Sequence, residues 1–216
     1  MRALQFSGVK ELITVADVPA SGELKVASGT IVTPSARDLA KDRGVRIVEV
    51  PAEQIVIAAA SEKTVAVGAD HGGFQLKEKL KGIFLELGLR VHDIGVHEEK
   101  SVDYPDIARA VAELVARGQA SRGVIIDGAG IGSCIVANKF PGIRAALCYD
   151  KASARNSREH NDSNVLTLGG RLLTGSQAED VLRVWLSTPF AGGRHAARVQ
   201  KIAEIEKATK HWTPRS

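Results

Sequence analysis

The sequence predicts an α/β fold with a parallel sheet in the larger, C-terminal part of the chain. From Thr64 onward, short apolar runs alternate with amphipathic stretches, which is typical of βαβ units. Glycine-rich polar loops follow two of the apolar runs. With 216 residues, 44% hydrophobic and 25% charged, the chain has the composition of a soluble globular protein.

The elements follow one another in βαβ order. Strands are predicted for five apolar runs: 64–70, 89–94, 122–128, 143–149 and 164–169. Apolar residues at helical spacing predict helices over four stretches: 74–87, 107–118, 176–187 and 194–208. Gly88 ends the first of these helices.

Residues 1–60 have a different pattern and are predicted to form an N-terminal extension to a main domain over 61–216. Small residues and turn formers over 18–30 predict a loop or linker. Thr33 and Pro34 mark the start of a short helix that Gly44 ends. A strand over 45–50 follows, and EQIVIAAASEK (53–63) is interpreted as a helix leading into the main domain.

Composition and charge exclude several classes of protein. No apolar run approaches the roughly 18 residues of a membrane helix, so a cytoplasmic protein without membrane contact is expected. Cys134 and Cys148 form neither a disulfide framework nor a metal cluster. The net charge of +4 arises after residue 190, where six Lys/Arg face two Asp/Glu. Aromatic residues are only 4%, so this local charge fits a small anion better than nucleic acid.

Ligands of doubly wound sheets bind beyond the carboxyl ends of the strands, which directs attention to two loops. Asp70, His71, Gly72 and Gly73 follow the first strand, and Asp127-Gly128-Ala129-Gly130-Ile131-Gly132-Ser133 follows the third. Backbone N–H groups in the second loop are able to approach an oxyanion or phosphate. No Gly-Lys-Ser/Thr follows, so this loop is not a P-loop.

Five segments in order carry a resemblance to a known family. They are GADHGGFQLKEKL (68–80), DYPDIA (103–108), GAGIGSCIVANKFPGIRAA (128–146), SREHNDSNVLTLGGR (157–171) and GGRHAARV (192–199). Together they resemble ribose-5-phosphate isomerase B and the galactose-6-phosphate isomerase subunits. The resemblance implies a Rossmann-like fold, a homodimer or tetramer with shared active sites, and interconversion of aldose and ketose phosphates without metal or cofactor.

A phosphate site is expected on the last helix. Arg194 and Arg198 are four residues apart, hence on one face, and their forked guanidiniums suit phosphate oxygens. By resemblance, His71 and His195 join them. The alternative is an ordinary solvated helix end. The resemblance also implies further substrate-binding residues: Tyr104, Gly128, Gly130, Gly132, Ser133, Asn161 and Arg171.

Opening the sugar ring needs a group that titrates near neutrality, and histidine supplies one. His160 occupies the family position for this role, and the resemblance makes Asn161 and Asp70 polar neighbours of the substrate, with Asp70 in the catalytic set. The alternative for His160 is a structural histidine. Three other histidines have no such context: His92, His97 and His211.

The base that moves a proton between C1 and C2 is where this chain departs from the family pattern. Many members have cysteine at the position of Asp127, and another branch has glutamate at the position of Ser133. Asp127 is therefore predicted to be the base, because a carboxylate reaches about as far as a thiolate and acts as a base in other isomerases. The alternative is that Asp127 only caps a helix or orders the loop. Cys134 is interpreted as a packing residue.

Two functions from different classes follow. The first is an aldose–ketose isomerase of a small sugar phosphate, of the ribose 5-phosphate/ribulose 5-phosphate type, working through an enediol. The second is a sugar-phosphate-binding or assembly protein without activity, since both usual bases are missing. Residues 30–47 are somewhat similar to segments of enzymes of bacterial microcompartments. Residues 1–60 are therefore hypothesised to dock to a shell or partner protein, with an oligomerisation arm or a surface patch as the alternative.

Overall fold

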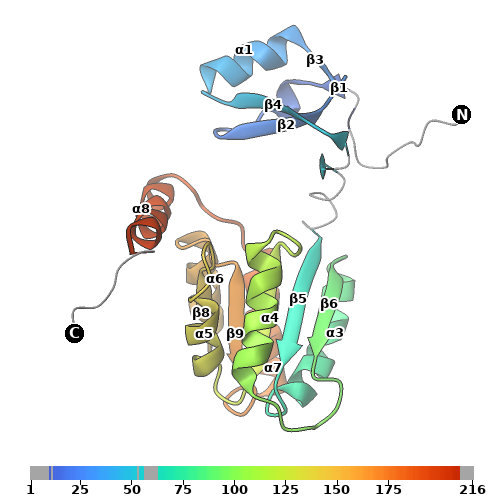
Figure 1. Cartoon of the computed structure of the whole chain (residues 1–216), viewed down its shortest axis with the longest axis vertical. Coiled ribbons are helices and arrows are strands. Elements are labelled where there is room, and N and C mark those ends of the chain that lie inside the picture. The colour runs from blue at the N-terminus through green and yellow to red at the C-terminus, as the bar shows by residue number, and fades with distance from the viewer. Residues whose placement is uncertain (1–9, 11, 53, 56–62, 210–216) are drawn as a thin grey trace, which may run out of the picture. The chain divides into compact units, whose positions relative to one another are not determined.

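The structure is a computed structural model that describes residues 10, 12–52, 54–55 and 63–209. The chain divides into two units, residues 1–62 and residues 63–216. Figure 1 shows the elements of both units. Each unit has its own hydrophobic core.

The larger unit is built on one parallel five-stranded sheet in the order β6-β5-β7-β9-β8. Its strands are β5 (Thr64–Ala69), β6 (Arg90–Gly95), β7 (Arg122–Asp127), β8 (Ala145–Leu147) and β9 (Val165–Gly169). All neighbours pair in parallel. The predicted α/β class and the five strands are confirmed, with β8 shorter than the run from which it was predicted.

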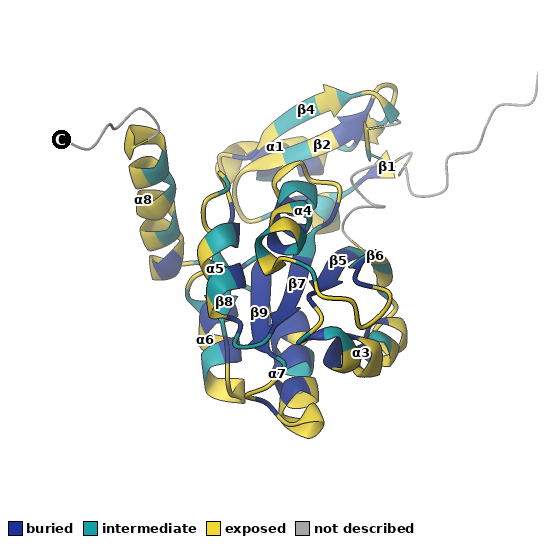
Figure 2. Ribbon diagram, turned by 60° about the horizontal axis from the view of Figure 1, so that its bottom comes forward, coloured by how far each residue is buried: buried dark blue, intermediate teal, exposed yellow. Residues whose placement is uncertain are grey.

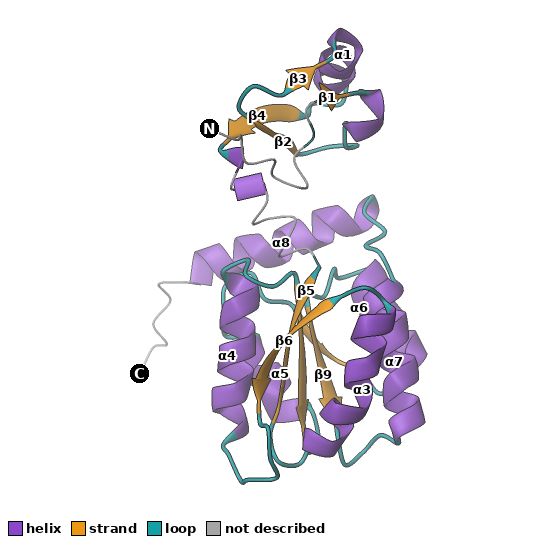
Figure 3. Ribbon diagram, turned by 90° about the vertical axis from the view of Figure 1, so that its right-hand side faces the viewer, coloured by secondary structure: helices purple, strands orange, loops and turns teal. Residues whose placement is uncertain are grey.

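Helices cover both faces of this sheet. α3 (Phe74–Glu86), α6 (Lys151–Glu159) and α7 (Gly175–Ser187) pack on one face, and α4 (Tyr104–Ala116) and α5 (Ile131–Ala137) pack on the other. The strands between them are buried, as the colours of Figure 2 show. α8 (Arg194–Thr209) lies at the end of the sheet where the strands begin (Figures 1 and 3).

Two helix boundaries differ from the sequence prediction for a physical reason. α4 begins at Tyr104 rather than at residue 107, because Pro105 suits a first helical turn and Asp103 precedes it. α6 was not predicted, since its nine residues are largely polar and show little apolar periodicity. Its start has a signal nevertheless, because Asp150 and Ser153 form a capping box.

The described part of the smaller unit contains two pairs of parallel strands, the α-helix α1 and the 3-10 helix η1. Its elements are β1 (Leu12–Ile13), the 3-10 helix η1 (Val15–Asp17), β2 (Glu23–Ala27), β3 (Ile31–Val32), α1 (Pro34–Asp42) and β4 (Arg46–Val50). β1 pairs with β3, and β2 pairs with β4. The helix signal is confirmed, since Thr33 Oγ1 accepts the Ala36 N–H at 3.3 Å and Gly44 has a φ of 66°.

The prediction of a loop over 18–30 was wrong, because Glu23–Ala27 forms β2. The strand lies between turns at Gly22 (φ 94°) and Gly29 (φ 87°), and these turn formers dominated the composition of the segment. Its five residues pair with β4, a contact that local sequence does not reveal. The helix interpreted over 53–63 falls largely outside the described residues. Among the described helices, none is both long and apolar enough for a membrane crossing.

An ion pair between Lys77 and Asp93 joins α3 to β6. The Lys77 side chain is fully buried, and its Nζ donates to Asp93 Oδ1 at 2.7 Å and to the Val96 carbonyl at 2.8 Å. Burial raises the pKa of Asp93. Hydrogen bonds from Lys77, Lys81 and the Gly95 N–H outweigh that effect and lower the pKa from 3.8 to about 2.

This depressed pKa predicts acid sensitivity. A carboxylate whose pKa is lower in the folded state contributes stability above its unfolded pKa of 3.8 and loses it as the pH falls toward about 2. The difference in unfolding free energy between wild type and Asp93→Asn should therefore be narrower at about pH 2.5 than at about pH 7. Urea unfolding at both pH values checks this. An unchanged difference would contradict the assigned pair.

Candidate active site

Three loops meet at the edge of the sheet where β5, β7 and β9 end. The Asp70 N–H donates to the Ile126 carbonyl at 3.1 Å, and the Gly170 N–H donates to the Asp127 carbonyl at 2.7 Å. Position 73 requires glycine, because a Cβ there would lie 2.1 Å from the Ile126 carbonyl oxygen. The loops are thus packed backbone against backbone at the edge where parallel sheets bind ligands.

We call the group at this edge the carboxyl-end cluster. Tyr104, at the start of α4, lies over the glycine-rich loop, since a Cβ at Gly132 would be 2.5 Å from its ring carbons. The Arg171 N–H donates to the Gly128 carbonyl at 3.1 Å. The side chains of His71 and Arg171 are exposed. The cluster comprises Asp70, His71, Tyr104, Asp127, Gly128, Gly130, Gly132, Ser133 and Arg171.

The Asp127 carboxylate is buried and heavily hydrogen-bonded. Its Oδ1 accepts the N–H groups of Ala129, at 2.8 Å, and Gly130, and its Oδ2 accepts the Ser133 N–H at 3.0 Å. Only 5% of the residue is exposed. These bonds order the glycine-rich loop. A carboxylate has about four acceptor positions, so about one remains for another proton.

Two further polar side chains of this cluster are buried. Asp70 is 8% exposed, and its Oδ1 accepts the Gly73 N–H at 3.0 Å. Ser133 is fully buried, and its Oγ has no hydrogen-bond partner within the described part of the chain. A buried hydroxyl without a hydrogen-bond partner raises the free energy of the folded protein. Such hydroxyls deserve an explanation, and one explanation is a ligand that completes the site.

The second group of expected site residues lies at the other end of the sheet, and we call it the amino-end cluster. It comprises His160, Asn161, Arg194, His195 and Arg198. His160 follows α6, and its ring stacks on His195 with centroids 4.2 Å apart and planes 6° apart. Arg194 and Arg198 are exposed on the first turns of α8.

Each imidazole of the stacked pair has a distinct environment. Asn156 Nδ2 lies 2.8 Å from His160 Nδ1, so Nε2 is the ring nitrogen of His160 left for a ligand. Burial lowers the pKa of His195, and the neighbouring His160, Arg194 and Arg198 lower it further. This part of the cluster therefore gathers positive charge that an anion would relieve.

The two clusters cannot meet within one chain. Asp127 is the last residue of β7, whose six residues span about 17 Å. α6 runs back along the sheet, so His160 lies where the strands begin. There the Glu159 carbonyl accepts the Ala191 N–H at 3.1 Å, and the Asn164 carbonyl accepts the Gly123 N–H at 2.9 Å. Figure 3 shows α8 crossing this same end.

The sequence reasoning missed several residues that surround the amino-end cluster. Asn156 precedes His160 by four residues on one helix, a spacing that brings side chains together. Arg158 and Asp162 have the same spacing and form an ion pair at 2.9 Å. A helix predicted from the capping box at Asp150 would have indicated the first pair but not the second, because Asp162 lies beyond the end of α6. Arg144, which also pairs with Asp162 at 2.9 Å, has no local signal.

In the described ranges, no three His, Cys, Asp or Glu side chains are arranged to hold a metal ion. His92 and His97 belong to neither cluster. His211 lies outside the described residues, as do the basic residues Lys210 and Arg215.

Comparisons with known proteins show to which family the chain belongs. The family model described as Ribose/Galactose Isomerase matches residues 65–202. Ribose-5-phosphate isomerase B of Escherichia coli is 43% identical over 145 residues, which cover 67% of this chain and 97% of that protein. D-erythrulose-4-phosphate isomerase of Pectobacterium atrosepticum is 38% identical over 149 residues, which cover 68% and 98%.

Solved structures agree with the sequence comparisons. Ribose-5-phosphate isomerase B of Clostridium thermocellum is 48% identical, with a TM-score of 0.66 over 68% of this chain and 99% of that one. The enzyme of Mycoplasma genitalium, solved with bound ribulose-5-phosphate, is 34% identical, with a TM-score of 0.64 over 67% and 96%. The chain therefore belongs to the ribose/galactose isomerase family of enzymes.

Proposed function

We propose that this protein interconverts the aldose and ketose forms of a small sugar phosphate, of the ribose 5-phosphate/ribulose 5-phosphate type, through an enediol. One observation carries the proposal. The chain has two clusters of complementary chemistry, one with carboxylates and glycines and one with histidines and arginines. A sugar phosphate needs both, and the two lie at opposite ends of one sheet.

The active site is therefore assembled from two copies of the chain, as a homodimer or as part of a tetramer. The carboxyl-end cluster of one copy meets the amino-end cluster of the other. Ile131 and Ile135 support this assembly, because they lie four apart on α5 beside the glycine-rich loop and are 51% and 57% exposed. An exposed apolar pair at helical spacing fits a protein interface.

The phosphate of the substrate is bound by Arg194 and Arg198 of one copy, with His195 beside them and His71 of the other copy. Both arginines are exposed on one helix face and form no ion pair among the described residues, so their guanidiniums are available. Two guanidiniums one turn apart suit the oxygens of a phosphate. Burial lowers the pKa of His195, and the same positive charge lowers it further.

His160 opens the sugar ring. Ring opening moves a proton from the C1 hydroxyl to the ring oxygen, and an imidazole near neutral pH exchanges protons at such positions. Its Nε2 serves this exchange because Asn156 occupies Nδ1. Asn161, next in the chain, and Asp70 of the other copy hold the sugar hydroxyls.

Asp127 is the base that takes the proton from C2 of the open aldose and returns it at C1. Its remaining acceptor position supports this role. The N–H groups of Gly128 and Gly132 in the glycine-rich loop and the unpartnered Ser133 hydroxyl face the enediol oxygens, while the Gly130 N–H holds Asp127 in place. Tyr104 and Arg171 close the site around the sugar.

Removing His160 tests the ring-opening role. His160→Ala should lower kcat/KM for ribose 5-phosphate about 100-fold, which is the size of a typical acid–base contribution. It should lower turnover of a four-carbon sugar phosphate much less, since such a sugar cannot close a normal ring. Steady-state kinetics on both substrates measures the difference. Equal losses on both would show that His160 does not act in ring opening.

A non-catalytic sugar-phosphate-binding or assembly protein is the second candidate function. The three N–H bonds to Asp127 favour it, because they are those of a loop-ordering carboxylate. The discriminating experiment incubates the protein with tetrose, pentose and hexose phosphates in heavy water. Deuterium exchange at C2, followed by NMR, supports the isomerase. Binding without exchange for every sugar supports the alternative.

Residues 1–60 dock the enzyme to a partner or shell protein, either in the cytoplasm or inside a bacterial microcompartment. Three exposed apolar side chains on this unit support the docking role. Leu12 and Ile31 are paired across β1 and β3 and are 49% and 66% exposed, and Val15 follows them at 48%. The relatives lack an equivalent, since residues of the larger unit match 96% or more of their length.

Deleting residues 1–62 should leave isomerase activity within about twofold of wild type, because the larger unit has its own core. The same deletion should abolish co-purification of the partner and change localisation of the protein in its native cells. Activity assays and pull-downs on full-length and truncated protein check both. Unchanged co-purification and localisation would disprove the docking role.

A further inference from the structure

The turn after His160 has an unusual backbone. Asp162 has a φ of 47°, and it is the one non-glycine residue in the left-handed region among the described residues. Aspartate tolerates this conformation better than most residues but still adopts it at a cost in free energy. Such outliers occur where surrounding contacts hold them, often at functional sites.

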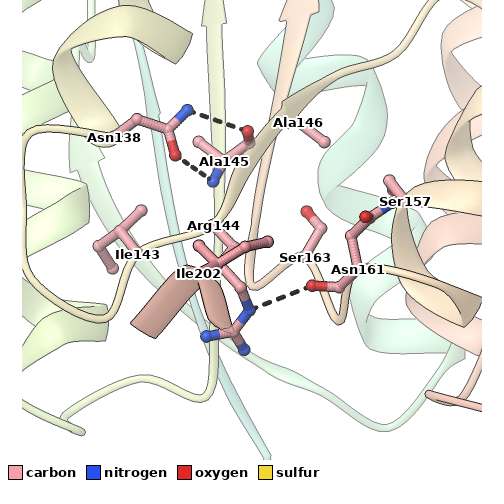
Figure 4. Close-up of a pocket in the computed structure, with 9 residues that line it drawn as sticks. All are labelled: Asn138, Ile143, Arg144, Ala145, Ala146, Ser157, Asn161, Ser163 and Ile202. Atoms are coloured by element: carbon pink, nitrogen blue, oxygen red, sulfur yellow. Dashed lines mark hydrogen bonds between the residues drawn. The ribbon is translucent and has the colours of Figure 1, made fainter. Parts of the chain in front are cut away.

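Arg144 holds this turn from the side of β8. Its Nη2 lies 2.9 Å from Asp162 Oδ2, and its Nε donates to the carbonyls of Asn161 at 3.1 Å and Asp162 at 2.9 Å. Figure 4 shows Arg144 reaching Asn161 beside a cavity of about 320 Å³. One guanidinium thus binds both the backbone and the side chain of the turn.

A second guanidinium, that of Arg158 on α6, also holds the turn. Its Nη1 lies 2.9 Å from Asp162 Oδ1 and also donates to the Ser163 carbonyl. Its Nε donates to the Thr188 carbonyl at 3.3 Å, in the segment that leads to Arg194. The guanidinium is buried against Trp185, with 5.7 Å from Cζ to the ring centroid. Arg158 therefore joins the two segments that carry the amino-end cluster.

We propose that Arg144, Arg158 and Asp162 form an arginine clamp that positions His160 and Asn161 for ring opening without touching the sugar. The inference rests on the proposed function, whose roles it deepens. The clamp holds both carboxylate oxygens of Asp162, which directly follows Asn161 and lies two residues after His160. Loss of one bond would let the turn relax from its left-handed conformation, and His160 would move relative to His195.

The clamp should matter most for ring opening and less for the later steps, in which Asn161 still holds the sugar hydroxyls. Ribose 5-phosphate is a closed ring in solution and has to be opened before the proton transfer. Ribulose 5-phosphate has its terminal oxygen phosphorylated and stays open, so exchange of its C1 hydrogen needs the base but no ring opening. A positioning residue of His160 therefore affects the first substrate more than the second.

The test compares Asp162→Asn with wild type, with His160→Ala and with Asp180→Asn as the matched control. Asparagine tolerates the left-handed conformation but cannot accept from both guanidiniums. Asp180 forms an exposed ion pair with Lys151 and belongs to neither cluster. Arg144→Ala, whose side chain is 25% exposed, is the second variant in case Asp162→Asn does not fold.

Both clamp variants should lose about 100-fold in kcat/KM with ribose 5-phosphate, as a misplaced catalytic group does. Their C1 exchange with ribulose 5-phosphate in heavy water should fall far less, and both activities of Asp180→Asn should stay close to those of wild type. The same loss in both assays, or no loss in either, would overturn the inference. A wild type without activity on either substrate would instead refute the proposed function.

Discussion

An Asp127→Asn variant is expected to lose about 10²- to 10⁴-fold in kcat, with little change in KM, because an amide cannot take the proton from C2. The side chain keeps its size, and the proposed phosphate-binding arginines are unchanged, so phosphate binding should persist. Steady-state kinetics with the preferred sugar phosphate gives both constants. Deuterium exchange at C2 shows whether proton abstraction is the step that fails.

Asparagine also disturbs the loop, since Asp127 accepts three N–H groups and an amide presents its own N–H to one of them. Asp127→Cys separates the two roles. A thiolate is a base but a weak acceptor for three N–H groups, so a catalytic role predicts activity well above that of Asp127→Asn. That activity should rise with pH toward about 8.5, where thiols ionise. A cysteine variant as inactive as the asparagine variant would show that Asp127 only orders the loop.

The predictable part of the fold is the part with strong local patterns. β5, β7 and β9 are buried on both faces, so their sequences are continuous apolar runs. A strand with one face in solvent would instead alternate apolar and polar residues. β2 lacks such a run, and only its pairing with β4 makes it a strand. α6 was missed because its apolar face is short, although its capping box marks its start.

For the candidate site, the position of the loops was predictable from the sequence, but the hydrogen bonds within it were not. The loops after β5 and β7 follow from the rule for parallel sheets, and the roles of the histidines and arginines followed from the family resemblance. The hydrogen bonds that hold the turn after His160 could not be predicted, because Arg144 and Asp162 are 18 residues apart and meet only in the folded chain. The three N–H bonds to Asp127 likewise depend on the backbone path of the loop.

Mixing two inactive variants should restore activity if each site is shared between copies. Asp127→Asn damages the carboxyl-end cluster, and Arg198→Ala damages the amino-end cluster, so neither protein alone is active. In a mixed dimer one site receives both damaged clusters and the other receives none. Random exchange makes half of the dimers mixed, each with one intact site, so about a quarter of wild-type activity is expected.

The matched control mixes two variants of the same cluster, His160→Ala with Arg198→Ala. Every site of that mixture contains one damaged amino-end cluster, so no activity should return whatever the degree of exchange. Subunits are exchanged by mild denaturation and dilution, and isomerisation is measured before and after. Restored activity in the first mixture alone requires a site that spans two chains. Without restoration, after mixed dimers have been detected by mass, the clusters would have to act within one chain, across the roughly 17 Å of β7 that separates them.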